Sequence, residues 1–180
     1  MSKVFTSAVV IIPPEEKWAP IQKIRERYDR QINRWMPHIT LLYPFKPAHL
    51  FNEIFHDFKK TCKKISSFSI ILKEIKSFSH GKNSHTIWVS PEPVKLIKDL
   101  QEKLLKIAPD CDDVNKYMNG YTPHLSIGQL KSSKGDLTKI INLFQESWNP
   151  IIFVVKKIAF ISREQGKQSR FQVKKEIFLK

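Results

Sequence analysis

The sequence is poor in cysteine and glycine. Its only 2 cysteines, Cys62 and Cys111, lie far apart and show no paired spacing. We therefore expect two reduced thiols, and neither a disulfide framework nor a cysteine-rich metal site. The chain has only 5 glycines and no low-complexity tract, which argues against extensive disorder.

Long hydrophobic runs are also missing. The apolar run at residues 8–12 is too short to span a membrane and ends at Pro13-Pro14. It lacks the length and the cleavage site of a secretory signal. We therefore expect an intracellular protein of the cytoplasm or nucleus, with no membrane partner.

Acidic residues are few compared with basic ones. The chain has 17 Asp and Glu against 31 Lys and Arg, a net charge of +14 at pH 7. Residues 1–90 hold 15 basic and 7 acidic side chains, and residues 91–180 hold 16 and 10, so no terminal tail carries the excess. A basic folded body attracts polyanions such as RNA. The alternative is a generally lysine-rich composition with no role in nucleic-acid binding.

Hydrophobic periodicity indicates alternating strands and helices. The expected strands cover residues 7–12, 38–43, 68–78, 86–89, 124–129, 151–161 and 171–179. The expected helices cover residues 15–28, 50–64, 93–107 and 137–144. This interleaving predicts an α/β or α+β fold with mostly antiparallel pairing. No linker divides the chain, so we expect residues 1–180 to form a single domain, acting as a monomer.

One five-residue pattern occurs twice. Pro37-His38-Ile39-Thr40-Leu41 is repeated as Pro123-His124-Leu125-Ser126-Ile127. Residues two apart on a strand point to the same face. His38 therefore shares a face with Thr40, and His124 with Ser126, while the aliphatic residues anchor each strand in the core.

Two such strands side by side would form a cleft suited to a phosphodiester. A neutral imidazole can take a proton from water or a ribose hydroxyl, and a protonated one can supply a proton to the leaving oxygen. The two hydroxyls can hold non-bridging phosphate oxygens. The alternatives are histidines that only cap strands, or a metal site, which the motifs disfavour because neither includes a carboxylate or a cysteine. We expect no metal and no cofactor.

At these motifs the sequence resembles the 2H phosphoesterase superfamily, and within it the 2′-5′ RNA ligase-like or cyclic nucleotide phosphodiesterase-like branch. The resemblance rests on residues 34–45, residues 121–128 and Ile161-Ser162-Arg163, and it extends over essentially the whole chain. It implies a bilobal fold with pseudo-twofold symmetry, in which two mostly antiparallel sheets with flanking helices surround a central cleft. It also implies metal-free chemistry on 2′,3′-cyclic phosphates, 2′-5′ linkages or RNA 3′ ends.

Several other residues are candidates for the site. Arg163 opens a polar loop after a strand and is a candidate phosphate contact, with solvent exposure as the alternative. Tyr43 and Tyr121 lie near the motif strands, where they could stack a base or simply pack. The four tryptophans, Trp18, Trp35, Trp88 and Trp148, are interpreted as core or lobe-junction packing.

The leading hypothesis is a metal-independent phosphoesterase that acts on RNA-type phosphodiesters through His38 and His124. One alternative is a 2′-5′ RNA ligase that runs the same chemistry in reverse. Another is a basic RNA- or nucleotide-binding module whose histidines only bind. No glycine-rich phosphate loop is visible in the sequence, which argues against nucleotide-driven ligation.

Overall fold

The computed structural model describes residues 2–116, 120–166 and 169–180. Its strands are β1 (Ser7–Ile11), β2 (Ile39–Leu42), β3 (Phe68–Ser79), β4 (Ser84–Glu92), β5 (Leu125–Lys131), β6 (Ile151–Val155), β7 (Lys157–Ser162) and β8 (Gln172–Phe178). Its α-helices are α1 (Trp18–Tyr28), α2 (Phe51–Cys62), α3 (Val94–Leu105) and α4 (Lys134–Ser147). Short 3-10 helices cover Glu15–Lys17, Ala48–Leu50 and Asp113–Asn115. The predicted α/β (α+β) class is confirmed. Across the described ranges, no helix is both long and apolar enough to cross a membrane.

The eight described strands form one antiparallel sheet in the order β6-β3-β4-β5-β2-β1-β7-β8. The two sheets expected from the sequence are the two halves of this sheet. They join where β2 meets β5, through the pairing of Ile39 with Leu125. Outward from this junction, β1 corresponds to β4, β7 to β3 and β8 to β6. This correspondence is the predicted pseudo-twofold relation.

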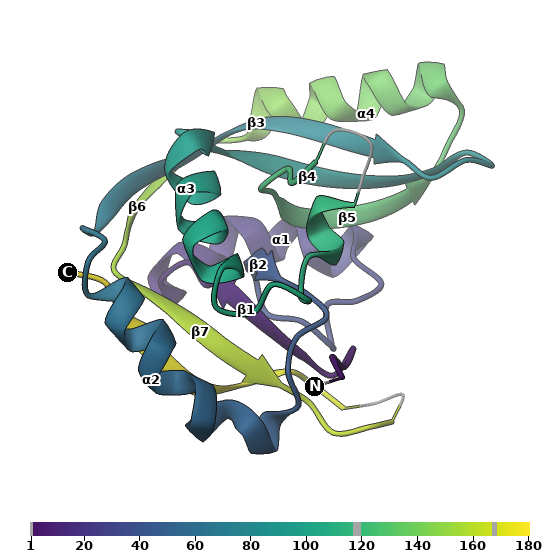
Figure 1. The fold of residues 1–180 in the computed structure, drawn as a ribbon. Coiled ribbons are helices and arrows are strands. Elements are labelled where there is room, and N and C mark those ends of the chain that lie inside the picture. The colour runs from purple at the N-terminus through teal and green to yellow at the C-terminus, as the bar shows by residue number, and fades with distance from the viewer. Residues whose placement is uncertain (1, 117–119, 167–168) are drawn as a thin grey trace.

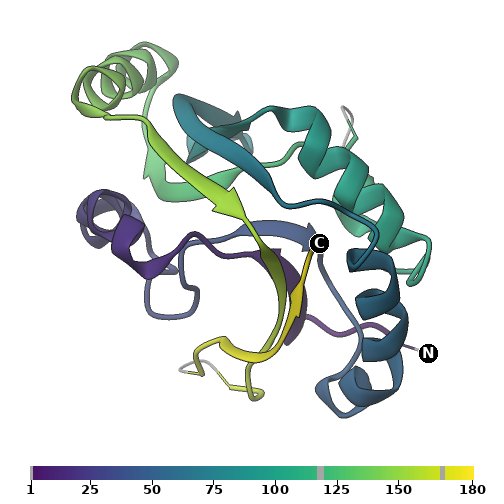
Figure 2. The ribbon, with the colours of Figure 1, turned by 90° about the vertical axis from the view of Figure 1, so that its left-hand side faces the viewer.

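The helices flank the curled sheet (Figure 1). Figure 2 shows α1 and α4 together on one side of the molecule, and α2 and α3 together on the other. The two halves repeat the same order of elements, β1-α1-β2-α2 in the first and β4-α3-β5-α4 in the second. Each motif strand therefore follows a helix and precedes another one.

The predicted strand over residues 151–161 is wrong, because the chain divides there into β6 and β7. Lys156 and Lys157 are both exposed, which breaks the two-residue alternation of a strand. β6 pairs with β3 at one edge, whereas β7 lies between β1 and β8 in the other half. In a flat sheet these strands would lie roughly 29 Å apart, at about 4.8 Å per strand. Only Lys156 separates them along the chain, so the sheet must curl.

Alternation along β2 and β5 separates two faces of the sheet. Ile39, Leu41, Leu125 and Ile127 are completely buried in the main core. Each α-helix contributes a side chain to this core: Ile21, Phe58, Leu100 and Phe144. The free thiols of Cys62 and Cys111 also lie in it. A second, smaller cluster lies on the other face and contains Ala8, Val10, Met36, Ala159, Ile161 and Phe171.

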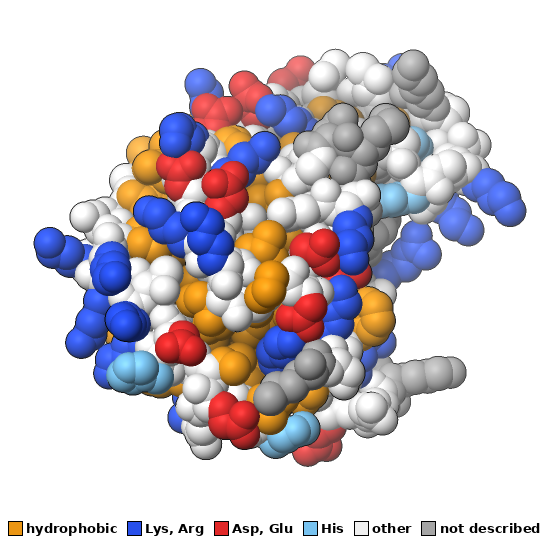
Figure 3. Space-filling model, in the orientation of Figure 1, with side chains coloured by type: hydrophobic (Ala, Val, Ile, Leu, Met, Phe, Trp, Pro, Cys, Tyr) orange, Lys and Arg blue, Asp and Glu red, His pale blue; other side chains and the backbone are white. Residues whose placement is uncertain are grey.

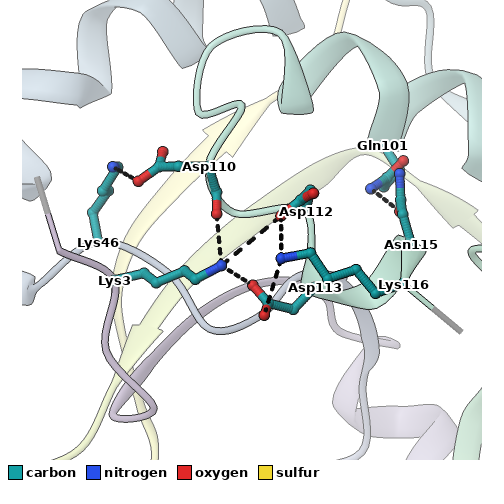
Figure 4. A network of polar contacts seen from close by, with 8 residues as sticks. All are labelled: Lys3, Lys46, Gln101, Asp110, Asp112, Asp113, Asn115 and Lys116. Atoms are coloured by element: carbon teal, nitrogen blue, oxygen red, sulfur yellow. Dashed lines mark hydrogen bonds and ion pairs between the residues drawn. The ribbon is translucent and has the colours of Figure 1, made fainter.

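A network of lysines and aspartates ties the start of the chain to the loop before β5 (Figure 4). Lys3 contacts the carboxylates of Asp112 and Asp113. The Nζ atom of Lys46 lies 2.5 Å from Oδ2 of Asp110. Lys46 follows β2 and Asp110 precedes β5, so this ion pair fixes the chain segments that leave one motif strand and lead into the other.

The positive charge is spread over the folded body. On the face drawn in Figure 3, lysine and arginine side chains lie over several elements, with acidic side chains between them. Carboxylates of Glu74, Asp99, Asp136 and Glu176 each pair with a lysine. Since basic residues outnumber acidic ones, a distributed positive excess remains.

At Gly128, β5 touches α1. A Cβ atom added to Gly128 would lie 2.7 Å from Cβ of Tyr28 and 3.3 Å from the Tyr28 carbonyl oxygen. The strand and the end of the helix therefore approach at a distance that only glycine permits.

We expect Gly128→Ala to lower the free energy of unfolding by roughly 1–3 kcal/mol, because the added methyl group must displace α1. Chemical denaturation measures this change. Gly135→Ala in α4 is the control, since nothing lies within 4 Å of the added Cβ and alanine suits a helix. An equal loss of stability in both variants would contradict the close approach at Gly128.

Candidate active site

The two motifs meet at one pocket. His38, Thr40, His124 and Ser126 all line a cavity of about 170 Å³. The remaining lining residues are Arg25, Asp29, Gln31, Trp35, Met36 and Gln129. Pockets that enclose drug-sized ligands measure about 300–1,000 Å³. This cavity therefore suits the reacting part of a substrate, with the rest of the substrate outside it.

Strand register explains why the motifs converge. Ile39 lies opposite Leu125 in the antiparallel pairing of β2 with β5. Moving one residue along each strand in opposite directions places His38 opposite Ser126, and Thr40 opposite His124. Each imidazole thus neighbours the hydroxyl of the other motif. The two histidines are diagonal neighbours, a relation that separates residues by about 7–8 Å.

Equivalent hydrogen bonds orient the two imidazoles, each to the backbone carbonyl two residues earlier in the chain. Nδ1 of His38 lies 2.7 Å from the Met36 carbonyl oxygen, and Nδ1 of His124 lies 2.8 Å from the Thr122 carbonyl oxygen. A carbonyl oxygen can only accept, so Nδ1 must carry the hydrogen in each ring. In the neutral rings, Nε2 then keeps its lone pair and is available to a substrate.

Burial keeps both histidines neutral. Burial, together with the nearby charges of Arg25 and His124, lowers the pKa of His38 from 6.5 to about 4, against the hydrogen bond to Met36 and the charge of Asp29. Burial also lowers the pKa of His124, against its hydrogen bond to Thr122. Both rings are therefore uncharged at neutral pH, and a bound anion would raise both pKa values.

Aromatic rings hold the two imidazoles differently. Trp35 stacks on His38 with ring centroids 4.7 Å apart, and Phe171 stacks on Trp35 at 3.8 Å. His124 instead meets the rings of Phe78 and Trp88 edge to face, at 5.0 and 5.8 Å. Trp35 was interpreted as packing from the sequence. It does pack, and it also forms part of the pocket wall.

A buried ion pair supports the His38 side of the pocket. Nε of Arg25 lies 2.7 Å from Oδ2 of Asp29, and both side chains are almost completely buried. The same guanidinium donates from Nη2 to the Trp35 carbonyl oxygen, and Asp29 accepts from the backbone N–H of Gln31. The pair therefore fixes the turn that leads from α1 to His38.

Sequence reasoning missed Arg25 and Asp29. A signal was present, because Arg25 falls on the same helical face as Ile21 and Tyr28, with Asp29 four residues further on. A charged pair at core-facing positions marks a buried ion pair. Gln31 and Gln129 were also missed, and their sequence positions carry no comparable signal.

Three predicted residues lie outside the pocket lining. Tyr121 is buried in the main core and its hydroxyl donates to the Thr40 carbonyl oxygen at 2.6 Å, which is a packing position. Tyr43 meets Trp35 edge to face and donates to the Phe5 carbonyl oxygen. Nη1 of Arg163 donates to the carbonyl oxygens of Glu164 and Gly166 and to Oγ of Ser169, so Arg163 holds its own loop. Their contacts with a substrate stay predictions.

The pocket also lacks an obvious set of metal ligands. Within residues 2–116, 120–166 and 169–180, no three His, Cys, Asp or Glu side chains gather closely enough to hold a metal ion.

The low pKa of His38 predicts a pH-dependent stability. As the pH falls from 6.5 to 4, the unfolded chain binds a proton at this position before the folded protein does. Unfolding should therefore become easier by about 3 kcal/mol over this window. Urea denaturation of wild type and His38→Gln at several pH values measures this effect, and the variant should lose that part of the dependence. Identical pH dependence in both proteins would rule out the low pKa.

Solved structures share this fold. TT0787 of Thermus thermophilus superposes with a TM-score of 0.66 at 15% sequence identity, with 97% of each chain covered. Escherichia coli LigT in complex with phosphate gives a TM-score of 0.64 at 14% identity, with 99% of each chain covered. The complex of LigT with 3′-AMP gives 0.64 at 14% identity, with 97% of each chain covered. At such identities the likeness establishes the fold alone.

Sequence comparison identifies the family. No curated protein sequence matches the chain. The sequence model of the 2′-5′ RNA ligase superfamily matches residues 13–167, a range that includes both histidine motifs. The match confirms the predicted resemblance to the 2H phosphoesterases and their 2′-5′ RNA ligase-like branch. The chain therefore belongs to the 2′-5′ RNA ligase superfamily.

Proposed function

We propose that this protein is a metal-independent phosphoesterase acting on RNA-type phosphodiesters, with His38 and His124 as its catalytic pair. One observation carries the proposal: two neutral imidazoles line one pocket, each with Nδ1 engaged and Nε2 available. Membership of the superfamily supports a phosphoesterase-type activity. LigT, which shares the fold, has been solved with phosphate and with 3′-AMP, and this supports a nucleotide or RNA substrate.

The opening of a 2′,3′-cyclic phosphate illustrates the chemistry. Water attacks phosphorus, and the neutral imidazole of one histidine takes the proton of the attacking water on Nε2. The bond from phosphorus to one ribose oxygen breaks, and that oxygen receives a proton from Nε2 of the other histidine, protonated beforehand. The protein ends the cycle with one proton moved between the two rings, and exchange with solvent restores the starting state.

The surroundings of the two rings favour different roles. His38 lies near the buried ion pair of Arg25 and Asp29, whose guanidinium opposes protonation of His38 more than the carboxylate favours it. The pKa of His124 is lowered by burial, against its hydrogen bond to Thr122. We therefore assign the base to His38, which stays neutral, and the acid to His124, whose pKa the phosphate charge must raise on binding.

The hydroxyls complete the phosphate site. Thr40 and Ser126 line the pocket beside the histidines and can donate to the non-bridging oxygens. Because the cavity admits only the reacting group, the nucleoside and any further chain lie outside it.

We expect His38→Ala and His124→Ala each to lower turnover of a 2′,3′-cyclic nucleotide by about 10²–10⁴-fold, the range for losing a general acid or base. The wild-type protein should work in excess EDTA and show a bell-shaped pH profile. Phosphorus NMR and mass spectrometry identify the product.

The matched control is His56→Ala, on the exposed surface of α2. It should keep wild-type turnover. Full activity in both His38→Ala and His124→Ala would contradict the proposal. Tight RNA binding by the wild-type protein with no product would favour a non-catalytic binding module.

The assignment of base and acid has its own test. A 4-nitrophenyl phosphodiester releases an oxygen that needs no proton, so it removes the need for a general acid. We expect this substrate to restore most of the activity lost in His124→Ala but not in His38→Ala. Rescue of His38→Ala instead would reverse the roles of the two histidines.

The family name supports a second candidate function, RNA ligation through a 2′-5′ bond. In this reaction a 5′-hydroxyl replaces water as the group that attacks the cyclic phosphate. The bond from phosphorus to the ribose 3′-oxygen breaks, and the same two histidines would serve as base and acid. Incubation of RNA carrying cyclic-phosphate and 5′-hydroxyl ends separates the two activities, because ligation gives a longer strand and hydrolysis gives a phosphomonoester.

A further inference from the structure

The two halves of the sheet differ on the face that carries the motifs. In the half built by β1 and β7, this face holds Ala8, Val10, Ala159 and Ile161, all buried. Phe171 and the partly buried ring of Trp35 pack against them. Over β1 and the adjoining part of β7, the described side chains of this face are therefore packed in their own small apolar core.

The other half presents a different surface. Strand register places Lys76 beside Trp88 and Trp88 beside Ser126, in one row across β3, β4 and β5. The next row runs from Phe78 through Thr86 to Gln129. Cross-strand partners share a face. A continuous strip of basic, aromatic and polar side chains thus leads outward from the pocket.

Phe78 is the centre of this strip. Its ring stacks on Trp88 with centroids 4.7 Å apart and an angle of 21° between the planes. It meets the His124 ring edge to face at 5.0 Å. Phe78 remains partly exposed although Trp88 beneath it is buried. An aromatic ring next to a catalytic imidazole, partly open to solvent, suits a stacked nucleobase.

Lys76 supplies a cation beside the Trp88 ring. Its Nζ lies 6.0 Å from the Trp88 ring centroid and 2.8 Å from a carboxylate oxygen of Glu74. Both side chains of that ion pair are about half exposed, at 44% and 50%. Exposed ion pairs contribute little to stability. Lys76 can therefore exchange Glu74 for a phosphate at little cost.

We propose that single-stranded RNA beyond the reacting phosphate lies over β3, β4 and β5, with one base stacked on Phe78 and a backbone phosphate at Lys76. This inference rests on the proposed function, and it makes the protein selective for oligonucleotides over mononucleotides. We call Lys76, Phe78 and Trp88 the aromatic platform.

The chain offers a matched control. Phe178 on β8 has Lys157 over its ring at 5.5 Å, and Lys157 pairs with Glu176 at 2.7 Å. This group repeats the platform's phenylalanine and lysine, and the glutamate that pairs with that lysine, at an outer strand of the other half. If RNA bound only by nonspecific attraction to basic and aromatic side chains, substitutions in the platform and in this control group would have equal effects.

The experiment compares a 2′,3′-cyclic mononucleotide with a trinucleotide ending in the same cyclic phosphate. Wild type should show a higher kcat/KM for the trinucleotide. Phe78→Ala should lower the trinucleotide value by roughly tenfold or more, the usual effect of losing one stacked base, with a smaller loss for the mononucleotide. Phe78→Tyr should retain the preference, and Phe78→Leu should lose it although it keeps an apolar side chain.

Lys76→Gln should reduce the slope of log affinity against log salt by about 1 for a trinucleotide 3′-phosphate, measured by fluorescence anisotropy. Phe178→Ala and Lys157→Gln should leave both the preference and the slope unchanged.

Equal loss for both substrates in Phe78→Ala would overturn the platform, since it would mean that the ring only supports His124. Equal effects at Phe178 would overturn it as well. If wild type turned over neither substrate, the proposed function would fail. The anisotropy measurement would still decide the platform, through the difference between the Lys76 and Lys157 variants.

Discussion

The pairing of Ile39 with Leu125 is the contact on which the rest of the site depends. It joins the two halves of the sheet and sets the register that brings His38 to Ser126 and His124 to Thr40. Side chains alternate between faces, so a shift of one residue would turn an imidazole into the core. The complete burial of both paired residues makes such a shift costly. Thus the core and the active site are specified by the same four apolar residues, those that alternate with the histidines and hydroxyls.

The near-symmetry of the site is broken by what surrounds it. One histidine is stacked under Trp35 and close to a buried arginine, whereas the other meets two aromatic rings at their edges. Chemistry on a phosphodiester needs a base and an acid at once, and two identical environments would give two groups with the same pKa. On the face that carries the motifs, a small apolar core also packs over the described part of β1 and β7, whereas Lys76 and Phe78 on β3 are exposed or partly exposed. The different packing around the two motif strands therefore bears on both the proposed roles of the histidines and the proposed path of the substrate.

Much of this was predictable from the sequence. The repeated pentapeptide identified all four motif residues of the pocket, because strand periodicity ties a histidine, a hydroxyl and two anchors together. The buried pair of Arg25 and Asp29 was missed, since arginine in a helix is usually exposed and only its position on the apolar face indicates otherwise. The division at Lys156 was also missed, because local patterns report strand character but not which neighbour a strand chooses. The pairing of β6 with β3, and of β7 with β1 and β8, decides where the chain divides. The assignment of residues 1–180 to one domain, and a monomeric state, stay predictions.

In the proposed mechanism, two neutral imidazoles with free Nε2 atoms face a single phosphate. Long-range proton–nitrogen NMR of the histidine rings can establish this arrangement, because it reports which nitrogen of each ring carries hydrogen. At neutral pH we expect hydrogen on Nδ1 and none on Nε2 in both His38 and His124. On addition of a nucleoside 3′-phosphate, one ring should become protonated and the other should stay neutral. Hydrogen on Nε2 of both rings in the unliganded protein, or no response of either ring to the phosphate, would rule out this mechanism.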